Sequence, residues 1–242
     1  MAPRAHGSRI RSEPTGSLVA VGFLASLDPP ARSEIERKCT WRRWSRGQQI
    51  LDREGVSDDV YFIVSGRAHV VDFHDSGQRF VIFDEIGPGG SFGELSAIDG
   101  LPRSAYVVAA EETVTGSMPA RGFIDLLFAK PEVGMAFLRR LSEMIRQSDS
   151  RIMEVSTLTA QHRVYLELLR RAKVGGGRPA NTGSIQPSPN HGEMAARVSA
   201  TRETVSRVLG DLTRQGLLSR DGDTLVITDV GRLISLAHTD RE

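Results

Sequence analysis

Glycines recur at intervals of roughly ten residues between Trp41 and Pro119, and the intervals between them hold short runs of Val, Ile, Phe and Tyr. These runs span residues 60–64, 68–73, 80–83 and 105–109. Short β-branched and aromatic runs bounded by turn-forming glycines are typical of strands. Several strands at this spacing predict an antiparallel β-roll, a jelly-roll-like sandwich or a barrel.

A different pattern begins after Pro131, where apolar residues follow a heptad repeat. The seam positions, at spacings of 3, 4, 3, 4 and 3, are Leu138, Leu141, Ile145, Ser148, Ile152 and Val155. Charged residues cover most of the remaining circumference, which favours a long helix paired with the same helix of a second copy. Packing on its own domain is the alternative. The Ser148 hydroxyl needs a hydrogen-bond partner, either a carbonyl of the preceding turn or a polar ligand at the seam.

Composition limits the possible functions. The 242 residues include 31 Lys+Arg, 30 Asp+Glu and 39% hydrophobic residues, which is ordinary for a globular chain of one or two domains. No segment reaches the about 18 apolar residues of a membrane span, and the N-terminus lacks the apolar core of a secretory signal. Cys39, the one cysteine, cannot form an internal disulfide or supply a four-cysteine zinc or iron–sulfur site. A cytoplasmic location is therefore expected.

The C-terminal third is mildly basic and has the pattern of two short helices. Residues 161–242 carry 12 basic and 9 acidic side chains, whereas residues 1–160 carry 19 and 21. Two helices joined by a tight turn are predicted at 192–198 and 202–212, and Thr201 suits the N-cap of the second.

At 100° per residue, the second of these helices has one aliphatic face and one polar face, the latter formed by Arg202, Glu203, Ser206 and Arg207. In a DNA major groove, Arg binds guanine and Glu accepts from cytosine. The following segment, 217–227, predicts a β-hairpin wing. An ordinary helical hairpin with a solvated face is the alternative.

Over residues 22–230 the sequence resembles the cyclic-AMP receptor protein (CRP/FNR-type) family of bacterial transcription regulators. The resemblance implies that Arg202 and Arg207 bind guanines and that Glu203 binds a cytosine of a TGTGA-type half-site. It also implies that Thr201 and Thr204 bind phosphates.

Ser199 departs from the family, which usually has glycine in this turn. A left-handed non-glycine residue costs about 1–2 kcal/mol, so we expect a turn of different shape.

Residues 91–105 resemble the family's phosphate-binding cassette, with Phe-Gly-Glu-Leu followed by Pro-Arg-Ser-Ala. The resemblance implies that a short helix opening near Gly93 offers N–H groups to a cyclic phosphate and that Arg103 neutralises its charge. Glu94 would accept from the ribose 2′-OH, Ser104 would contact the base or phosphate, and Leu95 belongs to the same site. A structural Glu94–Arg103 salt bridge in a ligand-free roll is the alternative.

The family closes the base pocket with polar residues of the long helix, at positions matched by Ser148 and Asp149. Serine is usual at the second position. An ionised Asp149 only accepts hydrogen bonds, from the adenine amino group or from guanine N1–H and N2–H, so cyclic AMP is the expected effector and cyclic GMP remains possible.

The predicted fold is α+β, with three ordered parts after a disordered arm. The arm spans residues 1–20. The ordered parts are a cyclic-nucleotide-binding roll at 21–130, a dimerisation helix at 131–158 and a winged helix-turn-helix domain at 159–242. A homodimeric, non-enzymatic regulator is expected, with double-stranded DNA and RNA polymerase as partners.

Three other functions remain open. A haem or redox sensor would draw its ligands from His69, His74 and Cys39. An effector-independent regulator would bind DNA without a nucleotide. A metal-dependent roll enzyme would place two nearby histidines and a carboxylate on inward strands, but His69 and His74 are five apart and would face opposite sides of one continuous strand. No metal site is expected.

Overall fold

The computed structural model describes residues 16–74, 79–174 and 181–238. The described chain divides into two compact units, of which the first holds residues 16–74 and 82–145 and the second holds 79–81, 146–174 and 181–238. No helix in these ranges is long and apolar enough to cross a membrane.

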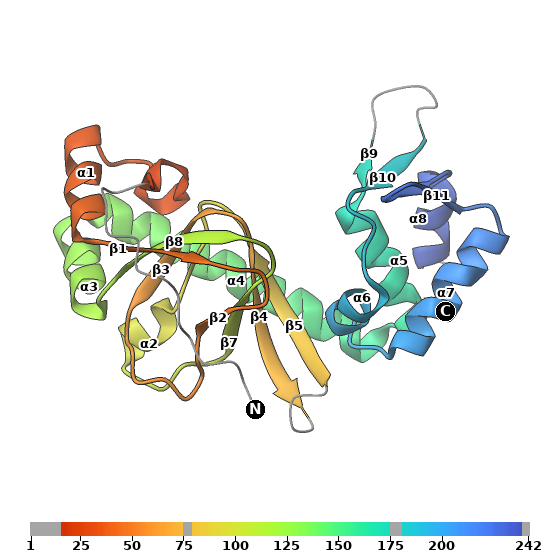
Figure 1. Cartoon of the computed structure of the whole chain (residues 1–242), viewed down its shortest axis with the longest axis horizontal. Coiled ribbons are helices and arrows are strands. Elements are labelled where there is room, and N and C mark those ends of the chain that lie inside the picture. Colours follow the sequence, from red (N-terminus) through yellow and green to blue (C-terminus); the bar gives the residue numbers. More distant parts are fainter. Residues whose placement is uncertain (1–15, 75–78, 175–180, 239–242) are drawn as a thin grey trace. The chain divides into compact units, whose positions relative to one another are not determined.

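The first unit is built on two four-stranded sheets (Figure 1), with strand orders β1-β8-β3-β6 and β2-β7-β4-β5. The recorded strand pairs are antiparallel, as between β3 and β8 and between β4 and β7. Its strands are β1 (Thr40–Trp44), β2 (Gln49–Leu51), β3 (Val60–Ser65), β4 (Ala68–His74), β5 (Arg79–Ile86), β6 (Ser91–Phe92), β7 (Tyr106–Ala109) and β8 (Thr113–Met118).

Inward-facing side chains from both sheets form one apolar cluster, which includes Trp44, Ile63, Phe92 and Val107. The indole Nε1 of Trp44 is buried but satisfied, because it donates to Thr115 Oγ1 at 2.9 Å. Strands predicted from the short apolar runs thus supply the core between two sheets that pack face to face.

Helices of the first unit form a second cluster against the roll. They are η1 (Leu18–Ala20), η2 (Gly22–Leu24), α1 (Pro29–Lys38), α2 (Glu94–Asp99), α3 (Ala120–Ala129) and the start of α4 (Pro131–Thr157). Most of the disordered arm expected at 1–20 lies outside the described residues, but its last residues are ordered. Leu18 is fully buried, and its N–H donates to Glu36 Oε1 at 2.7 Å.

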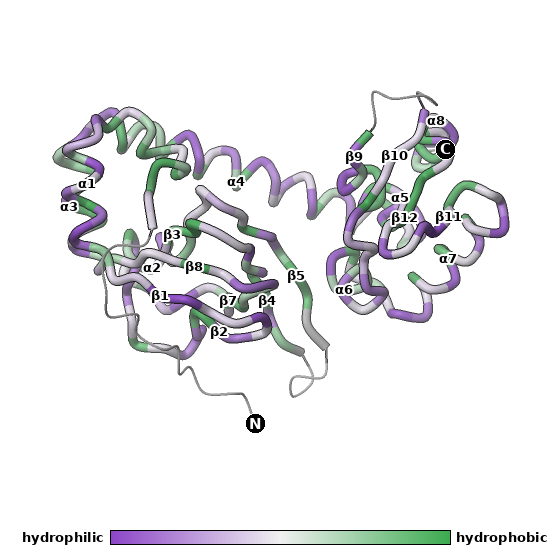
Figure 2. Tube along the Cα trace, turned by 45° about the horizontal axis from the view of Figure 1, so that its top comes forward, coloured by the Kyte–Doolittle hydropathy of each residue, from purple (hydrophilic) through white to green (hydrophobic). Residues whose placement is uncertain are grey.

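The 27-residue helix α4 is anchored in the first unit by its opening turns. Val133 and Phe137 are buried, and the Phe137 ring makes edge-to-face contacts with Phe23 at 5.3 Å and Phe123 at 5.1 Å. Polar and apolar segments alternate along the helix (Figure 2). The opening turns of the helix therefore pack against the roll, and the rest of the helix carries both polar and apolar residues.

The second unit contains helices packed on a small sheet of order β11-β12-β10-β9. Its elements are α5 (Ala160–Arg171), β9 (Lys173–Val174), β10 (Gly183–Ile185), α6 (His191–Arg197), α7 (Arg202–Arg214), β11 (Leu218–Asp221), β12 (Thr224–Ile227) and α8 (Val230–His238). The predicted hairpin wing is confirmed by the β11–β12 pairing.

Strand β10 pairs with β12 and buries Ile185. Together the two units confirm the predicted α+β class.

Phe137→Ala tests the anchoring of α4. Removing a buried ring that contacts two others leaves a cavity, so the free energy of unfolding should fall by about 3–5 kcal/mol. Chemical denaturation measures this. The matched control is Phe128→Ala, because Phe128 is 83% exposed. Equal small losses in both variants would contradict the anchoring.

Candidate functional site

Gly93 is the N-cap residue of α2. It has a left-handed backbone with φ of 85°, and a Cβ here would lie 2.8 Å from both Arg103 Nη1 and Asp59 O. Only glycine fits this combination of conformation and close approach. The carbonyl of Gly93 in turn accepts a hydrogen bond from Arg103.

Arg103 is 5% exposed, and its guanidinium is held by acceptors of the roll. Nη1 donates to Gly93 O at 2.8 Å and to Ser96 Oγ at 2.7 Å, and Nη2 donates to Asp59 O at 2.8 Å. These contacts occupy three of the five N–H donors of an arginine. Burial lowers the pKa of this guanidinium, which Tyr61 and Asp59 partly oppose.

Glu94 is 3% exposed, and its Oε2 has no hydrogen-bond partner among the described residues. Burial raises the pKa of this carboxyl, while its own backbone N–H and the charges of Arg140 and Arg103 lower it. The recorded ion pairs within the described part of the chain do not include the Glu94–Arg103 salt bridge considered as an alternative, because Arg103 donates to Gly93, Ser96 and Asp59 instead. A buried carboxylate oxygen without a donor is costly and is suited to a hydroxyl supplied from outside.

Arg140 of α4 belongs to this site, although the sequence places it on the charged outer faces of the helix. Its Nη2 donates to Ser91 O at 2.7 Å. The Arg140 Nε and the Ser91 Oγ are both buried without a partner in the described structure. Three unsatisfied polar atoms, from Ser91, Glu94 and Arg140, thus occur in residues linked by contact or by charge. The pattern of charges along one helix could not reveal this, because the partner strand lies 49 residues away.

A cleft of about 570 Å³ lies beside Arg103. The other residues that line it are Arg53, Glu54, Asp72, Phe73, Leu101, Pro102 and Tyr106. Leu95 and Ser104 are exposed. Arg103 is therefore the member of the predicted cassette set that borders this cleft.

Ser148 and Asp149 are exposed on the part of α4 that belongs to the second unit. Four of the other predicted seam residues are also exposed: Leu138 (55%), Ile145 (62%), Ile152 (63%) and Val155 (45%). Leu141 is half-buried and packs against the helical cluster of the first unit. An apolar stripe of this length favours a partner surface over solvent.

The second helix predicted in the C-terminal third is α7, and it has the expected exposed polar face and buried aliphatic face. Arg202, Glu203, Ser206 and Arg207 are exposed, whereas the buried face consists of Val205, Val208, Leu209 and Leu212. The predicted N-cap is confirmed, because Thr201 Oγ1 accepts from Thr204 N at 3.1 Å. The Thr201 and Thr204 hydroxyls also bond each other at 3.0 Å.

The turn before α7 does not have the different shape expected from Ser199. Ser199 adopts φ of 50°, the left-handed conformation for which glycine is the usual residue. The strain of about 1–2 kcal/mol is therefore present, and neighbouring contacts must offset it.

Family models match both units of the chain. The cyclic nucleotide-binding domain model matches residues 41–130, and the Crp-like helix-turn-helix domain model matches residues 162–236. The chain belongs to the CRP/FNR family of transcription regulators. As a family member it is a cyclic-nucleotide-binding, DNA-binding transcription regulator and not an enzyme.

Relatives of this CRP/FNR-family chain match over most of its length. The CRP-like cAMP-activated global transcriptional regulator of Mycobacterium tuberculosis is 24% identical over 221 residues, covering 91% of this chain and 98% of the relative. The cyclic AMP receptor protein of Thermus thermophilus is 28% identical over 196 residues, covering 81% and 87%. The structure of a CooA mutant from Carboxydothermus hydrogenoformans aligns with a TM-score of 0.73 at 20% identity, covering 95% and 99%.

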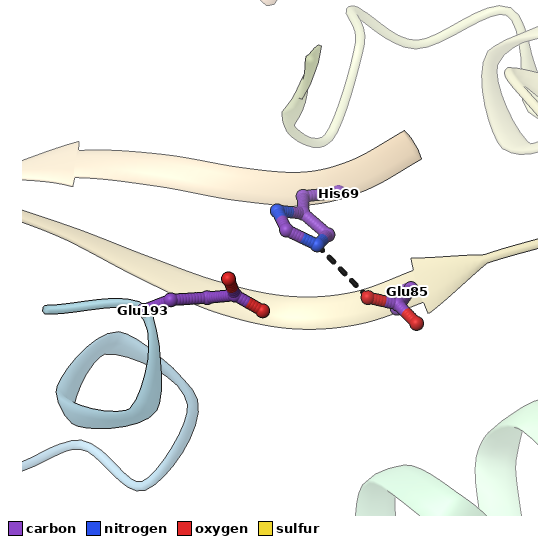
Figure 3. Close-up of side chains that lie close together, drawn as sticks. All are labelled: His69, Glu85 and Glu193. Atoms are coloured by element: carbon purple, nitrogen blue, oxygen red, sulfur yellow. Dashed lines mark hydrogen bonds and ion pairs between the residues drawn. The ribbon is translucent and has the colours of Figure 1, made fainter. Parts of the chain in front are cut away.

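Two of the residues named for a haem or metal alternative, His69 and Cys39, can be described in this family member. Figure 3 shows His69 of β4 beside Glu85 of β5, with His69 Nε2 and Glu85 Oε2 hydrogen-bonded at 3.0 Å. Burial raises the pKa of the Cys39 thiol to about 12, which keeps it protonated and a poor ligand at neutral pH. The His74 side chain lies outside the described residues.

Glu94→Gln tests the buried carboxyl. Burial raises the folded-state pKa of Glu94 above the ordinary 4.5. The contribution of this carboxyl to the free energy of unfolding is therefore fully present below pH 4.5 and is lost as the pH rises through the raised pKa. Between pH 5 and pH 8 the wild type should therefore lose more stability than the Gln variant, as measured by denaturant unfolding at each pH. Glu143→Gln, at an exposed position of α4, should behave as wild type. Identical pH profiles for Glu94→Gln and wild type would show that the carboxyl is not buried as described.

Proposed function

We propose that the chain is a homodimeric regulator that binds cyclic AMP at Glu94 and Arg103 and then binds a near-palindromic TGTGA-type DNA site through α7. The observation that carries the proposal is the buried Glu94 oxygen without a donor, close enough to Arg103 and Arg140 for their charges to act on it. A cyclic nucleotide presents both the hydroxyl and the anionic phosphate that such a set binds.

Each cassette residue has a role that suits its surroundings. The two N–H donors that Arg103 keeps after its three protein contacts would bind the cyclic phosphate. Glu94 would accept from the ribose 2′-OH, and this hydrogen bond would favour its ionised form. Gly93 would allow the close approach of the backbone, and the exposed Leu95 and Ser104 would face the ligand.

Cyclic AMP is the preferred effector because the relatives from Mycobacterium tuberculosis and Thermus thermophilus are named for cyclic AMP. Asp149 supports cyclic GMP as a second ligand, since its carboxylate would accept from guanine N1–H and N2–H. Ser148 and Asp149 would contact the base from the seam of α4. Calorimetric comparison of wild type with Asp149→Ser separates the two effectors.

DNA binding rests on the exposed polar face of α7. Arg202 and Arg207 would bind guanines, Glu203 would accept from cytosine, and Ser206 would contact the same groove. Thr201 and Thr204, whose hydroxyls already cap the helix, would add phosphate contacts. Two copies joined along α4 would present two such helices to successive major grooves, and RNA polymerase is the proposed downstream partner.

A constitutive DNA binder is the second candidate. It is favoured by the three bonds that Arg103 makes to its own chain. Those bonds already give three of its N–H donors an acceptor, so the guanidinium depends less on a bound ligand. The two candidates differ in whether a nucleotide changes DNA affinity.

Titration of a duplex with a near-palindromic TGTGA-type site tests the switch. Cyclic AMP should raise DNA affinity at least tenfold in wild type, because only a ligand with differential affinity shifts the two states. Arg103→Ala should weaken cyclic AMP binding at least tenfold, about 1.4 kcal/mol, and abolish the rise. Arg53→Ala is the control, since Arg53 lines the same cleft but pairs with Asp72. Equal DNA affinity with and without the nucleotide would establish the constitutive binder.

Ile152→Glu tests the dimer seam. A charge at this 63% exposed seam position would be buried against the partner helix, so the variant should sediment as a monomer. Phe128→Glu introduces the same glutamate at an exposed residue of α3 and should leave the sedimenting mass that of the wild type. A monomeric wild type, or a dimeric Ile152→Glu, would contradict the seam.

A further inference from the structure

Three successive carbonyls at the end of α6 accept hydrogen bonds from arginines of other helices. Arg151 of α4 donates through Nη2 to Arg197 O. Arg163 of α5 donates through Nε to Val198 O at 2.7 Å and through Nη2 to Ser199 O at 3.0 Å. Carbonyls at a helix C-terminus lack helical partners, so these guanidinium groups satisfy them. We call Arg151 and Arg163 the turn clamp.

The turn clamp acts on the strained residue of the helix-turn-helix. Ser199 has φ of 50°, and its carbonyl and that of Val198 are both held by one rigid, planar guanidinium. Such a fork fixes the directions of two adjacent peptide groups at once, and those directions depend on the backbone angles of Ser199. The clamp is therefore placed to keep Ser199 in the left-handed conformation.

The same side chain also binds the end of α4. Arg163 Nη1 donates to Leu158 O at 2.7 Å, and Leu158 directly follows α4. Arg151 lies beside seam residue Ile152 in the sequence. The turn clamp thus joins the last turns of the proposed dimerisation helix to the turn from which α7 starts.

We propose that Arg163, assisted by Arg151, is a positioning residue for DNA recognition. It holds Ser199 left-handed and thereby sets the direction in which α7 leaves α6, with Thr201 capping the new helix three residues before Thr204. The proposal rests on the proposed DNA-binding function of α7. It explains how this chain uses serine at a turn where glycine would need no such support.

The test uses the full-length protein and fluorescence anisotropy with the TGTGA-type duplex in saturating cyclic AMP. Arg163→Ala should weaken DNA binding at least tenfold and leave cyclic AMP affinity within twofold. Arg170→Ala is the matched control, because it removes the same charge from the same helix but breaks a pair with Glu154 at 3.0 Å. It should bind DNA within twofold of wild type.

A rescue variant separates positioning from general stability. Adding Ser199→Gly to Arg163→Ala should restore DNA affinity at least threefold, because glycine adopts the left-handed conformation without a clamp. Loss of binding that Ser199→Gly does not restore would overturn the proposal, and so would wild-type affinity in Arg163→Ala.

Hydrogen exchange gives a readout that needs no DNA. The Ala200 N–H donates to Ala195 O across the turn at 3.0 Å. Arg163→Ala should speed exchange at Ala200 at least tenfold, and Ser199→Gly should reverse this. If wild type binds no DNA, the proposed function fails while the exchange result still decides the clamp. Unchanged exchange in Arg163→Ala would overturn it.

Discussion

The carboxyl group of Glu94 is buried while one of its oxygens lacks a donor among the described residues, and the proposed ligand site depends on this constraint. A buried charge without full hydrogen bonding costs free energy, so it persists only where the surrounding contacts are strong. Arg103 makes no recorded bond to Glu94 within the described residues, but its charge and that of Arg140 favour the ionised carboxyl. The guanidinium of Arg103 is itself fixed by Gly93 O, Ser96 Oγ and Asp59 O. In the proposed site, a ligand that brings a hydroxyl and an anion would add to these contacts instead of displacing them.

Helix α4 takes part in both units through separate residues. In the first unit Phe137 packs in the aromatic cluster and Arg140 bonds Ser91 O. In the second unit Arg151 bonds the end of α6. A coupling mechanism needs a physical element whose state both sites bias, and α4 is an element that has residues in each unit.

Local patterns predicted the features that depend on local sequence. The strands between Val60 and Ala109 follow from short β-branched runs, and the two faces of α7 follow from helical spacing. The Thr201 cap follows from its hydroxyl and the helix after it. These features are determined by residues a few positions apart, which a single sequence displays.

Features that depend on distant partners could not be predicted. Arg103 bonds Asp59 from 44 residues away, and Arg163 bonds Ser199 from 36. Strand β10 has three residues, too few for a pattern, and forms because β12 offers an edge. The Ser199 expectation was wrong for the same reason, since the guanidinium that bonds its carbonyl belongs to Arg163 of α5.

Proton release on ligand binding tests the role of Glu94 most directly. Calorimetric titration of cyclic AMP in buffers of different ionisation enthalpy, at several pH values above 4.5, counts the protons exchanged. A ribose hydroxyl that donates to the carboxylate lowers its raised pKa, so wild type should release a fraction of a proton that Glu94→Gln does not. Cyclic AMP binding of equal affinity and equal proton count in both proteins would contradict the proposed site.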